Sequence, residues 1–281
     1  MLPKPEWLRL RYAQTPNQEA VEKLLDSLQL NTVCKEARCP NCRECFSRKT
    51  ATFLIMGTNC TRNCRFCDVR NDVPQELDPD EPVRVAAAVR ELGLKYVIIT
   101  SVTRDDLPDG GASHFAQTIT EIKKAAPETI IEVLIPDLKG SITGLQTVTD
   151  AKPAVISHNM ETVSSLYSTV RPQANYHTSL ELLKNIKVLN RDIRSKSGLM
   201  VGLGETKEEI CGLFEELREV GCEFLTIGQY LSPSKHHLPV REYIQPAVFD
   251  EYGSIARKMG FSFVASAPLV RSSYHAGEAF A

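Results

Sequence analysis

The sequence predicts an α/β fold, a partial (β/α)6 TIM-like barrel, and three observations lead to that prediction. Short apolar runs of strand type alternate with amphipathic helical patterns along most of the 281 residues. The runs are continuously apolar, which is typical of a parallel sheet covered by helices. Six such units are too few for a complete eightfold barrel. A doubly wound open sheet remains the alternative.

The expected strands are short runs rich in branched apolar residues. They lie at residues 52–56, 96–100, 130–135, 154–157, 199–201 and 224–228. Apolar residues three and four positions apart predict helices between them, around residues 85–92, 182–189 and 213–220. The order of strand and helix is therefore repeated along the chain.

Capping residues mark three helix starts. Thr15 precedes Pro16, and proline is favoured at the first helical position because its missing N–H has no partner there. Thr206 and Glu209 form a capping-box pattern, in which each side chain bonds the backbone of the other residue. Pro246 predicts a further helix after the sixth strand.

We expect one structural domain with an extension at each end. A chain of this length, with 42% hydrophobic residues, can form one large core. Residues 1–50 form an N-terminal extension with a cysteine loop, residues 51–245 form the barrel, and residues 246–281 form a C-terminal extension. The C-terminal extension is expected to close the barrel mouth.

The overall charge and the N-terminus exclude several classes of protein. A net charge of −2 gives no general case for binding nucleic acid or an anionic membrane. The N-terminus lacks the apolar region of a secretory signal, and no apolar run is long enough to span a bilayer. We therefore expect a cytoplasmic protein, whose nine cysteines serve metal binding or redox chemistry rather than disulfides.

Three closely spaced cysteines directly follow the first expected strand. Cys60, Cys64 and Cys67 form a CxxxCxxC pattern, and we call residues 60–67 the second cysteine loop. Parallel barrels build their active sites at this end of the strands. Three thiolates from one loop can hold three corners of a [4Fe–4S] cluster and leave one iron open. Structural zinc is the competing interpretation, but it prefers four protein ligands.

A further group of cysteines lies upstream, in residues 34–45, which we call the first cysteine loop. Cys34, Cys39 and Cys45 have a different spacing from the second loop. Cys42 lies within the same span and forms CxxC units with both Cys39 and Cys45, so the spacing alone leaves the ligand set ambiguous. Near these loops the charge is locally basic, because residues 34–70 contain eight Lys or Arg against three Asp or Glu.

The second cysteine loop, with Phe66 before its last cysteine, resembles the signature of the radical S-adenosylmethionine (SAM) enzymes. That resemblance implies that Cys60, Cys64 and Cys67 bind a [4Fe–4S] cluster whose open iron chelates SAM. Residues 198–205 are similar to a family pattern that lines the adenine, although Met200 replaces its isoleucine. Thr100 and Ser101 stand where many relatives carry Gly-Gly-Glu, a departure that leaves the ligands of the SAM amine open. The SAM-binding positions that the resemblance implies are Phe66, Thr100, Ser101, Asn159, Arg171, Met200, Gly202 and Glu205.

The first cysteine loop and the C-terminal Arg-Ser-Ser-Tyr at 271–274 make the chain similar to the lipoyl synthase family over nearly its whole length. This resemblance implies a sulfurtransferase with a second, auxiliary [4Fe–4S] cluster on Cys34, Cys39 and Cys45. Ser272 is its fourth ligand, with Ser273 as the alternative, and Cys42 is not a ligand. Serine is a hard and poorly matched ligand for a cluster iron, so it can release as the cluster donates sulfur.

The family reaction inserts sulfur at C6 and C8 of an octanoyl chain on a carrier protein. The resemblance thus implies two partners, an octanoylated lipoyl-carrier domain and a low-potential electron donor of the ferredoxin or flavodoxin type. Two alternatives remain from the sequence. One is another radical SAM sulfur-transfer enzyme of the methylthiotransferase kind, and the other is a zinc-stabilised binding protein.

Overall fold

The computed structural model describes residues 3–9, 15–48 and 51–280. At its centre is an eight-stranded sheet in which the order in space follows the order in sequence, from β1 to β8. Strands β2 to β8 are parallel to their neighbours, and β1 is antiparallel to β2. Sequential order excludes the doubly wound alternative, in which the order reverses at a switch point. The α/β partial barrel is confirmed.

The strands match the expected runs closely. Their bounds are β1 Asn31–Thr32, β2 Thr52–Ile55, β3 Tyr96–Ser101, β4 Ile130–Leu134, β5 Val155–Ser157, β6 Arg194–Val201, β7 Phe224–Gln229 and β8 Phe263–Ser266. The main differences are β1, which extends the sheet at one edge, and the N-terminal half of β6; β8, in the C-terminal extension, forms the other edge. In that half Ser195, Lys196 and Ser197 are buried polar residues, so no apolar run marks them.

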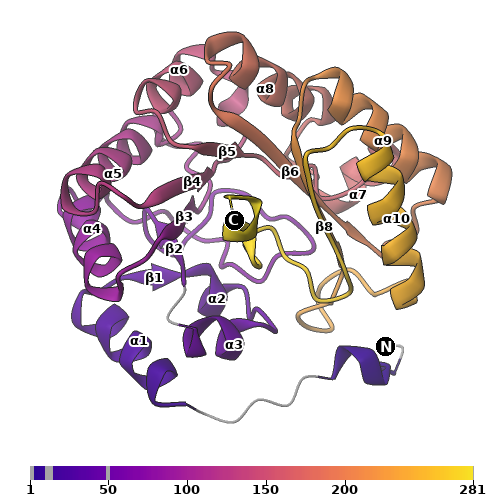
Figure 1. The fold of residues 1–281 in the computed structure, drawn as a ribbon, viewed down its shortest axis with the longest axis horizontal. Coiled ribbons are helices and arrows are strands. Elements are labelled where there is room, and N and C mark those ends of the chain that lie inside the picture. Colours follow the sequence, from indigo (N-terminus) through magenta and orange to yellow (C-terminus); the bar gives the residue numbers. More distant parts are fainter. Residues whose placement is uncertain (1–2, 10–14, 49–50, 281) are drawn as a thin grey trace.

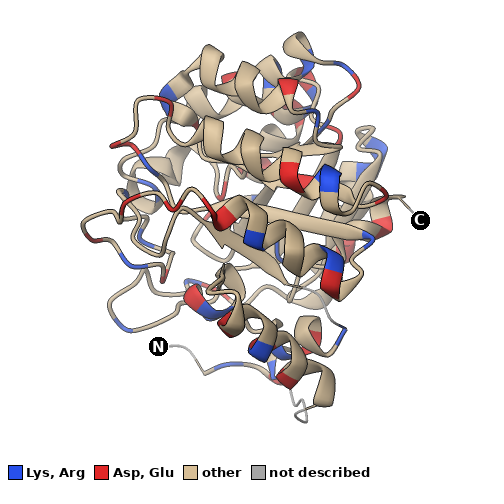
Figure 2. Cartoon of the chain, turned by 90° about the vertical axis from the view of Figure 1, so that its left-hand side faces the viewer, with Lys and Arg blue, Asp and Glu red and all other residues tan. Residues whose placement is uncertain are grey.

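Helices surround the sheet and enclose it from outside (Figure 1). The longer helices are α1 Pro16–Ser27, α4 Glu81–Leu92, α5 Ala112–Ala125, α6 Ile142–Asp150, α8 Tyr176–Leu189, α9 Lys207–Glu219 and α10 Pro246–Lys258. The shorter ones are α2 Val33–Glu36, α3 Cys42–Ser47 and α7 Tyr167–Val170, with 3-10 turns η1 Glu6–Leu8, η2 Leu138–Gly140, η3 Ser164–Leu166 and η4 Ala276–Phe280. Lys, Arg, Asp and Glu positions are distributed along the helices and the loops between them (Figure 2).

The expected helix starts are confirmed. The Thr15 side chain accepts a hydrogen bond from the Gln18 N–H, directly before Pro16. Thr206 and Glu209 make both bonds of a capping box at the start of α9. Local sequence therefore marks where these two helices begin.

The C-terminal tail crosses the mouth of the barrel and then enters its interior. After β8 it passes the end of β7, where Pro268 O accepts a hydrogen bond from the Gln229 N–H. Its last turn, η4, ends beside the first residues of two strands on opposite sides of the barrel, and Phe280 contacts Tyr96 and Phe224 at ring-centroid distances of 5.8 and 6.0 Å. In Figure 1 the C-terminus accordingly lies within the ring of strands.

The division into residues 1–50, 51–245 and 246–281 stays a prediction, and the first segment includes positions outside the described residues.

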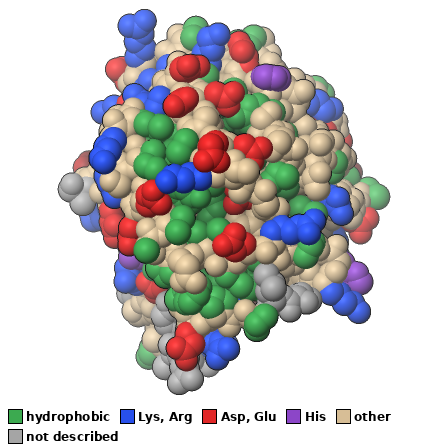
Figure 3. All heavy atoms as spheres, turned by 90° about the vertical axis from the view of Figure 1, so that its right-hand side faces the viewer, with side chains coloured by type: hydrophobic (Ala, Val, Ile, Leu, Met, Phe, Trp, Pro, Cys, Tyr) green, Lys and Arg blue, Asp and Glu red, His purple; other side chains and the backbone are tan. Residues whose placement is uncertain are grey.

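A buried ion pair lies in the barrel interior, because Lys196 Nζ lies 2.8 Å from Glu132 Oε1 and each side chain is 1% exposed. Acidic and basic side chains are interspersed on the face over α9 and α10 (Figure 3). Among the helices in the described ranges, none has the length and apolar character to cross a bilayer.

Candidate active site

The second cysteine loop lies where the sequence placed it, directly after β2 at the carboxyl edge of the parallel strands. The Cys60 thiol accepts hydrogen bonds from two backbone N–H groups, those of Arg62 at 3.4 Å and Thr103 at 3.3 Å. Bonds of this kind stabilise thiolate sulfur and tune iron–sulfur clusters. The loop is thereby fastened to the segment that follows β3.

The three thiols of this loop lie near one another. Burial, together with smaller contributions from the charges of Cys64 and Cys60, raises the pKa of Cys67 to about 12. Burial also raises the pKa of Cys64, while the adjacent Arg171 guanidinium opposes that rise. Thiols with raised pKa values stay protonated at neutral pH, so a metal that binds here must displace protons.

The first cysteine loop forms a second, separate group. Cys34 lies in α2 and Cys45 in α3, with Cys39 between the two helices. Burial, together with the charges of the nearby Cys34 and Cys39, raises the pKa of Cys45 to about 12. Cys42 belongs to the same group in space, because Cys34 and Cys39 also add to the rise that burial causes in its pKa. Proximity alone therefore does not separate Cys42 from the three predicted ligands.

The C-terminal tail is anchored on both sides of the first cysteine loop. Asn41 donates from Nδ2 to Leu269 O at 2.7 Å, and Tyr274 OH donates to the Glu44 carboxylate at 3.0 Å. Residues 270–273 lie between these anchors. This arrangement brings Ser272 and Ser273, which are over two hundred positions away in sequence, to the loop that carries the first triplet.

Two of the predicted SAM contacts meet in one small apolar cluster. Phe66 and Met200 both pack against the cluster formed by Val170, Leu203 and Tyr230. An apolar surface with an aromatic ring beside the second cysteine loop is suited to a flat purine. The structure thus brings together Phe66 and Met200, which the sequence predicted separately as SAM contacts.

Three other predicted contacts have buried polar atoms without a hydrogen-bond partner among the described residues. They are Ser101 Oγ, Asn159 Oδ1 and Arg171 Nε. Buried polar groups are normally paired, so orphaned atoms at one site indicate a polar ligand. The amine, carboxylate and ribose groups of SAM provide the donors and acceptors that these atoms need, and the residues present therefore fit that ligand.

The remaining predicted contacts have their polar atoms engaged within the protein. Thr100 Oγ1 donates to Leu134 O at 3.0 Å, so its hydroxyl stabilises the sheet. The Glu205 carboxylate accepts hydrogen bonds from the N–H groups of Gly202 and Leu203 at 2.5 and 2.9 Å. A Cβ on Gly202 would lie 2.4 Å from Glu242 O, so only glycine fits there. These three residues therefore maintain the local structure of the site. Of the neighbouring hydroxyls of Thr100 and Ser101, only that of Ser101 has no hydrogen-bond partner among the described residues.

Three charged residues of this region were given no site role by the sequence analysis, although Arg271 lies in the Arg-Ser-Ser-Tyr motif. Arg62 binds two carboxylates, those of Asp105 and Asp137. Glu161 has a positive φ of 69° and lies close enough to Arg171 and Arg271 for both to oppose the pKa rise that its burial causes. Arg271 adjoins Cys39. The position of these charged residues next to motif residues was a signal in the sequence. It does not show which partners their side chains contact, because tertiary packing sets the direction of a side chain.

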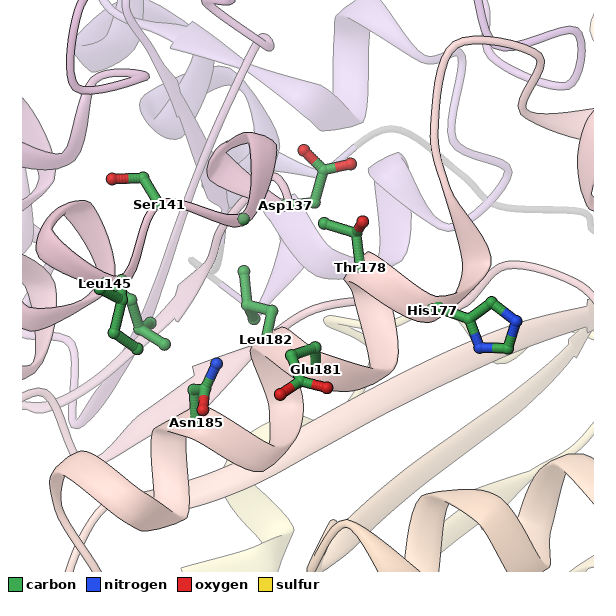
Figure 4. Close-up of a pocket in the computed structure, with 10 residues that line it drawn as sticks. Asp137, Ser141, Leu145, His177, Thr178, Glu181, Leu182 and Asn185 are labelled. Carbon is green, nitrogen blue, oxygen red and sulfur yellow. The ribbon is translucent and has the colours of Figure 1, made fainter.

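A cavity of about 270 Å³ lies beside this region, between the turn that follows β4 and helix α8. Figure 4 shows Asp137 and Ser141 on the turn, with Thr178, Leu182 and Asn185 on the facing helix. In the described ranges no three His, Cys, Asp or Glu side chains are close enough to share one metal ion. A cubane cluster does not need that closeness, because each thiolate binds a different iron.

The comparison with family models defines the class of protein. The model described as "Radical SAM superfamily" matches residues 54–217, and the chain belongs to this superfamily of enzymes, which use a [4Fe–4S] cluster and SAM. Within it the chain belongs to the lipoyl synthase family, whose members transfer sulfur. It is 57% identical over 276 residues to the lipoyl synthase of Alkaliphilus metalliredigens (strain QYMF), covering 98% of this chain and 95% of the relative. The predicted family is confirmed.

Other comparisons agree. The lipoyl synthase of Caldicellulosiruptor saccharolyticus is 58% identical, with 98% of this chain and 96% of the relative covered. Among solved structures, HydG, a maturase of the [FeFe]-hydrogenase, has a TM-score of 0.59 at 13% identity, covering 97% of this chain and 68% of that one. At that identity the likeness supports the fold alone.

Proposed function

We propose that the chain is a lipoyl synthase that inserts two sulfur atoms, at C6 and C8, into an octanoyl group carried on a lysine of a carrier protein. The observation that carries the proposal is the pair of separate cysteine groups, with the tail anchored across the first one. In the proposed reaction one iron–sulfur cluster stays intact and another gives up sulfur, so the two clusters need separate sets of ligands. Two sets of thiols on different loops meet these opposite demands.

In this proposal Cys60, Cys64 and Cys67 hold the radical SAM cluster and leave one iron for the cosubstrate. When bound, the cluster and SAM together supply a hydrogen-abstracting 5′-deoxyadenosyl radical. Ser101, Asn159 and Arg171 orient the polar groups of SAM through their unpaired atoms. Phe66 and Met200 bind the adenine and exclude water from its face. Thr100, Gly202 and Glu205 maintain the shape of this site.

Cys34, Cys39 and Cys45 hold the auxiliary cluster, which supplies the sulfur, and Ser272 is its fourth ligand. The anchors at Asn41 and Glu44 support a serine from the tail as that ligand, since residues 270–273 lie between them. They do not separate Ser272 from Ser273. A hydroxyl is a hard ligand for iron and exchanges more readily than a thiolate. A serine would therefore be the most readily released of the four ligands.

The family implies a lipoyl or octanoyl carrier as the substrate. We propose that exposed basic residues near the two cysteine loops receive an acidic carrier domain. Arg43, Arg65 and Arg70 are exposed and have no ion pair within 4.0 Å in the described part of the chain. Reduction of the radical SAM cluster requires a low-potential donor, for which a ferredoxin or flavodoxin is the proposed type.

One experiment separates the two cysteine groups. The wild type, reconstituted without oxygen, is expected to bind roughly eight iron and eight sulfide per chain, and Cys34→Ala roughly four of each. Cys34→Ala should still cleave SAM reductively but form no lipoyl product on an octanoylated carrier peptide. The matched variant Cys60→Ala should lose both activities while it retains the other cluster.

Iron content, SAM cleavage and lipoyl formation are measured on the same preparations. Equal loss of SAM cleavage and lipoyl formation in Cys34→Ala would contradict separate roles for the two loops. Stoichiometric zinc without charge-transfer absorbance in the wild type would overturn the proposal altogether.

A further inference from the structure

The second cysteine loop has no regular secondary structure to hold it. Residues 56–80 are all described, and they contain no helix or strand between β2 and α4. An irregular loop loses much conformational entropy when it is ordered, so its thiols need other contacts to be held in place. The strongest side-chain contacts available come from Arg62, which lies between Cys60 and Cys64.

Arg62 is buried and forms hydrogen bonds with two carboxylates. Its Nε and Nη2 donate to Asp105 at 2.6 and 2.9 Å, and its Nη1 and Nη2 donate to Asp137 at 2.6 and 2.7 Å. The side chains of Arg62 and Asp137 are 5% and 2% exposed, so solvent screens this contact little. Both pairs are bidentate, the geometry for which a guanidinium is suited. We call these three residues the clasp.

The clasp joins the loop to the ends of two strands. Asp105 follows β3 and Asp137 follows β4. Beyond Asp137 the chain has three successive positive φ angles, 49° at Leu138, 51° at Lys139 and 75° at Gly140. Such strain in non-glycine residues persists only where the surroundings enforce it. The turn is enforced from the clasp, because Asp137 accepts from the Lys139 N–H and Lys139 Nζ donates to Asp105 O at 2.8 Å.

We propose that the clasp is a positioning device that holds the second cysteine loop in its iron-binding shape before iron arrives. The inference rests on the proposed role of Cys60, Cys64 and Cys67 as cluster ligands. Arg62, Asp105 and Asp137 touch no reacting atom in this role. They act by fixing the loop against the ends of β3 and β4, so that the three thiols are presented together.

The test is hydrogen exchange of the metal-free, full-length chain. Asp137→Asn and Arg62→Gln are expected to speed amide exchange in residues 58–70 by at least about tenfold and to leave the exchange of β6 and β7 unchanged. Arg62→Lys keeps the charge but cannot bond both carboxylates in two-pronged fashion, so it should also fail to protect the loop. If only the positive charge of residue 62 mattered, the amides of residues 58–70 in Arg62→Lys would exchange as slowly as in the wild type.

Glu223→Gln is the matched control. Glu223 is a carboxylate held by two cations, Lys187 and Arg194, at the far end of the barrel. It should leave residues 58–70 as protected as in the wild type. Unchanged loop exchange in Asp137→Asn, an equal rise across the whole barrel, or the same loop response in Glu223→Gln would each overturn the proposal. Because no metal is present in this measurement, its result is independent of whether the wild type later binds iron.

Discussion

At the scale of single residues, an oriented chain of hydrogen bonds supports one of the proposed SAM contacts. Arg171 Nη1 donates to Tyr167 OH at 2.6 Å, and the Tyr167 hydroxyl donates to Ser179 Oγ at 2.7 Å. Ser179 then donates to His158 Nε2, and His158 Nδ1–H donates to Ile135 O at 2.8 Å. Because a carbonyl oxygen can only accept, this last bond fixes the neutral tautomer of His158 and thereby the direction of the chain.

His158 should make stability depend on pH. Burial lowers the pKa of His158 from 6.5 to about 4, so between these values the unfolded chain binds a proton that the folded chain does not. The stabilising contribution is complete above pH 6.5 and is lost as pH falls toward 4, by about 3 kcal/mol in all. Denaturant unfolding of the metal-free chain at several pH values should show a shallower acid loss in His158→Gln. Replacing the exposed His177 should leave that slope as in the wild type, and equal slopes in all three proteins would contradict the argument.

Which site residues the sequence could identify depended on their chemistry. Cysteine spacing identified both thiol groups, because metal ligands carry a local pattern. Thr100 and Ser101 are neighbours in sequence, yet only Ser101 has an unpaired hydroxyl, since alternate residues of a strand face opposite sides. Arg62 lay inside the recognised motif and was still missed. Its partners Asp105 and Asp137 are 43 and 75 positions away, a separation that no local pattern reveals.

At the scale of elements, the tail is the segment on which the auxiliary site depends. It approaches β7 so closely that a Cβ on Gly228 would lie 2.1 Å from Val270 O, two residues before Ser272. The sequence predicted that the tail returns to the barrel mouth, because its serine had to reach the first cysteine loop. It did not reveal that the tail ends inside the barrel, since Phe280 contacts Tyr96 and Phe224 only through tertiary packing.

Gly228→Ala should therefore displace the tail and disturb the auxiliary cluster selectively. We expect the reconstituted variant to retain roughly four of eight iron and its reductive SAM cleavage, and to lose most lipoyl formation. Gly212→Ala is the matched control, because no atom lies within 4 Å of its added Cβ, and alanine favours a helix over glycine by about 1 kcal/mol. An iron content of Gly228→Ala equal to that of Gly212→Ala would contradict the role assigned to the tail.

At the scale of the whole molecule, the two ends of the barrel have different tasks. The second cysteine loop, with the exposed Arg65 and Arg70, follows β2 at the carboxyl ends of the parallel strands, where such barrels place their chemistry, whereas the first cysteine loop lies between the end of β1 and the start of β2. The opposite end is closed by Phe280 and by the pairing of Glu223 with Lys187 and Arg194. The alternation of strand and helix was enough to predict this architecture. The buried pair of Lys196 and Glu132 was not predictable, because a polar interior is exceptional.

Docking of an acidic carrier at the basic end should make turnover sensitive to salt. Raising ionic strength from about 0.05 M to about 0.5 M shortens the screening length severalfold, so KM for an octanoylated carrier should rise while reductive SAM cleavage without carrier stays nearly constant. Arg65→Gln and Arg70→Gln should each raise KM at low salt and reduce its salt dependence, because they remove exposed cations beside the second cysteine loop. Arg90→Gln, at the end of α4 near the far end of the barrel, serves as the control and should leave KM unchanged. A KM that does not respond to salt, or that responds equally in all three variants, would mean that the carrier is held by other contacts.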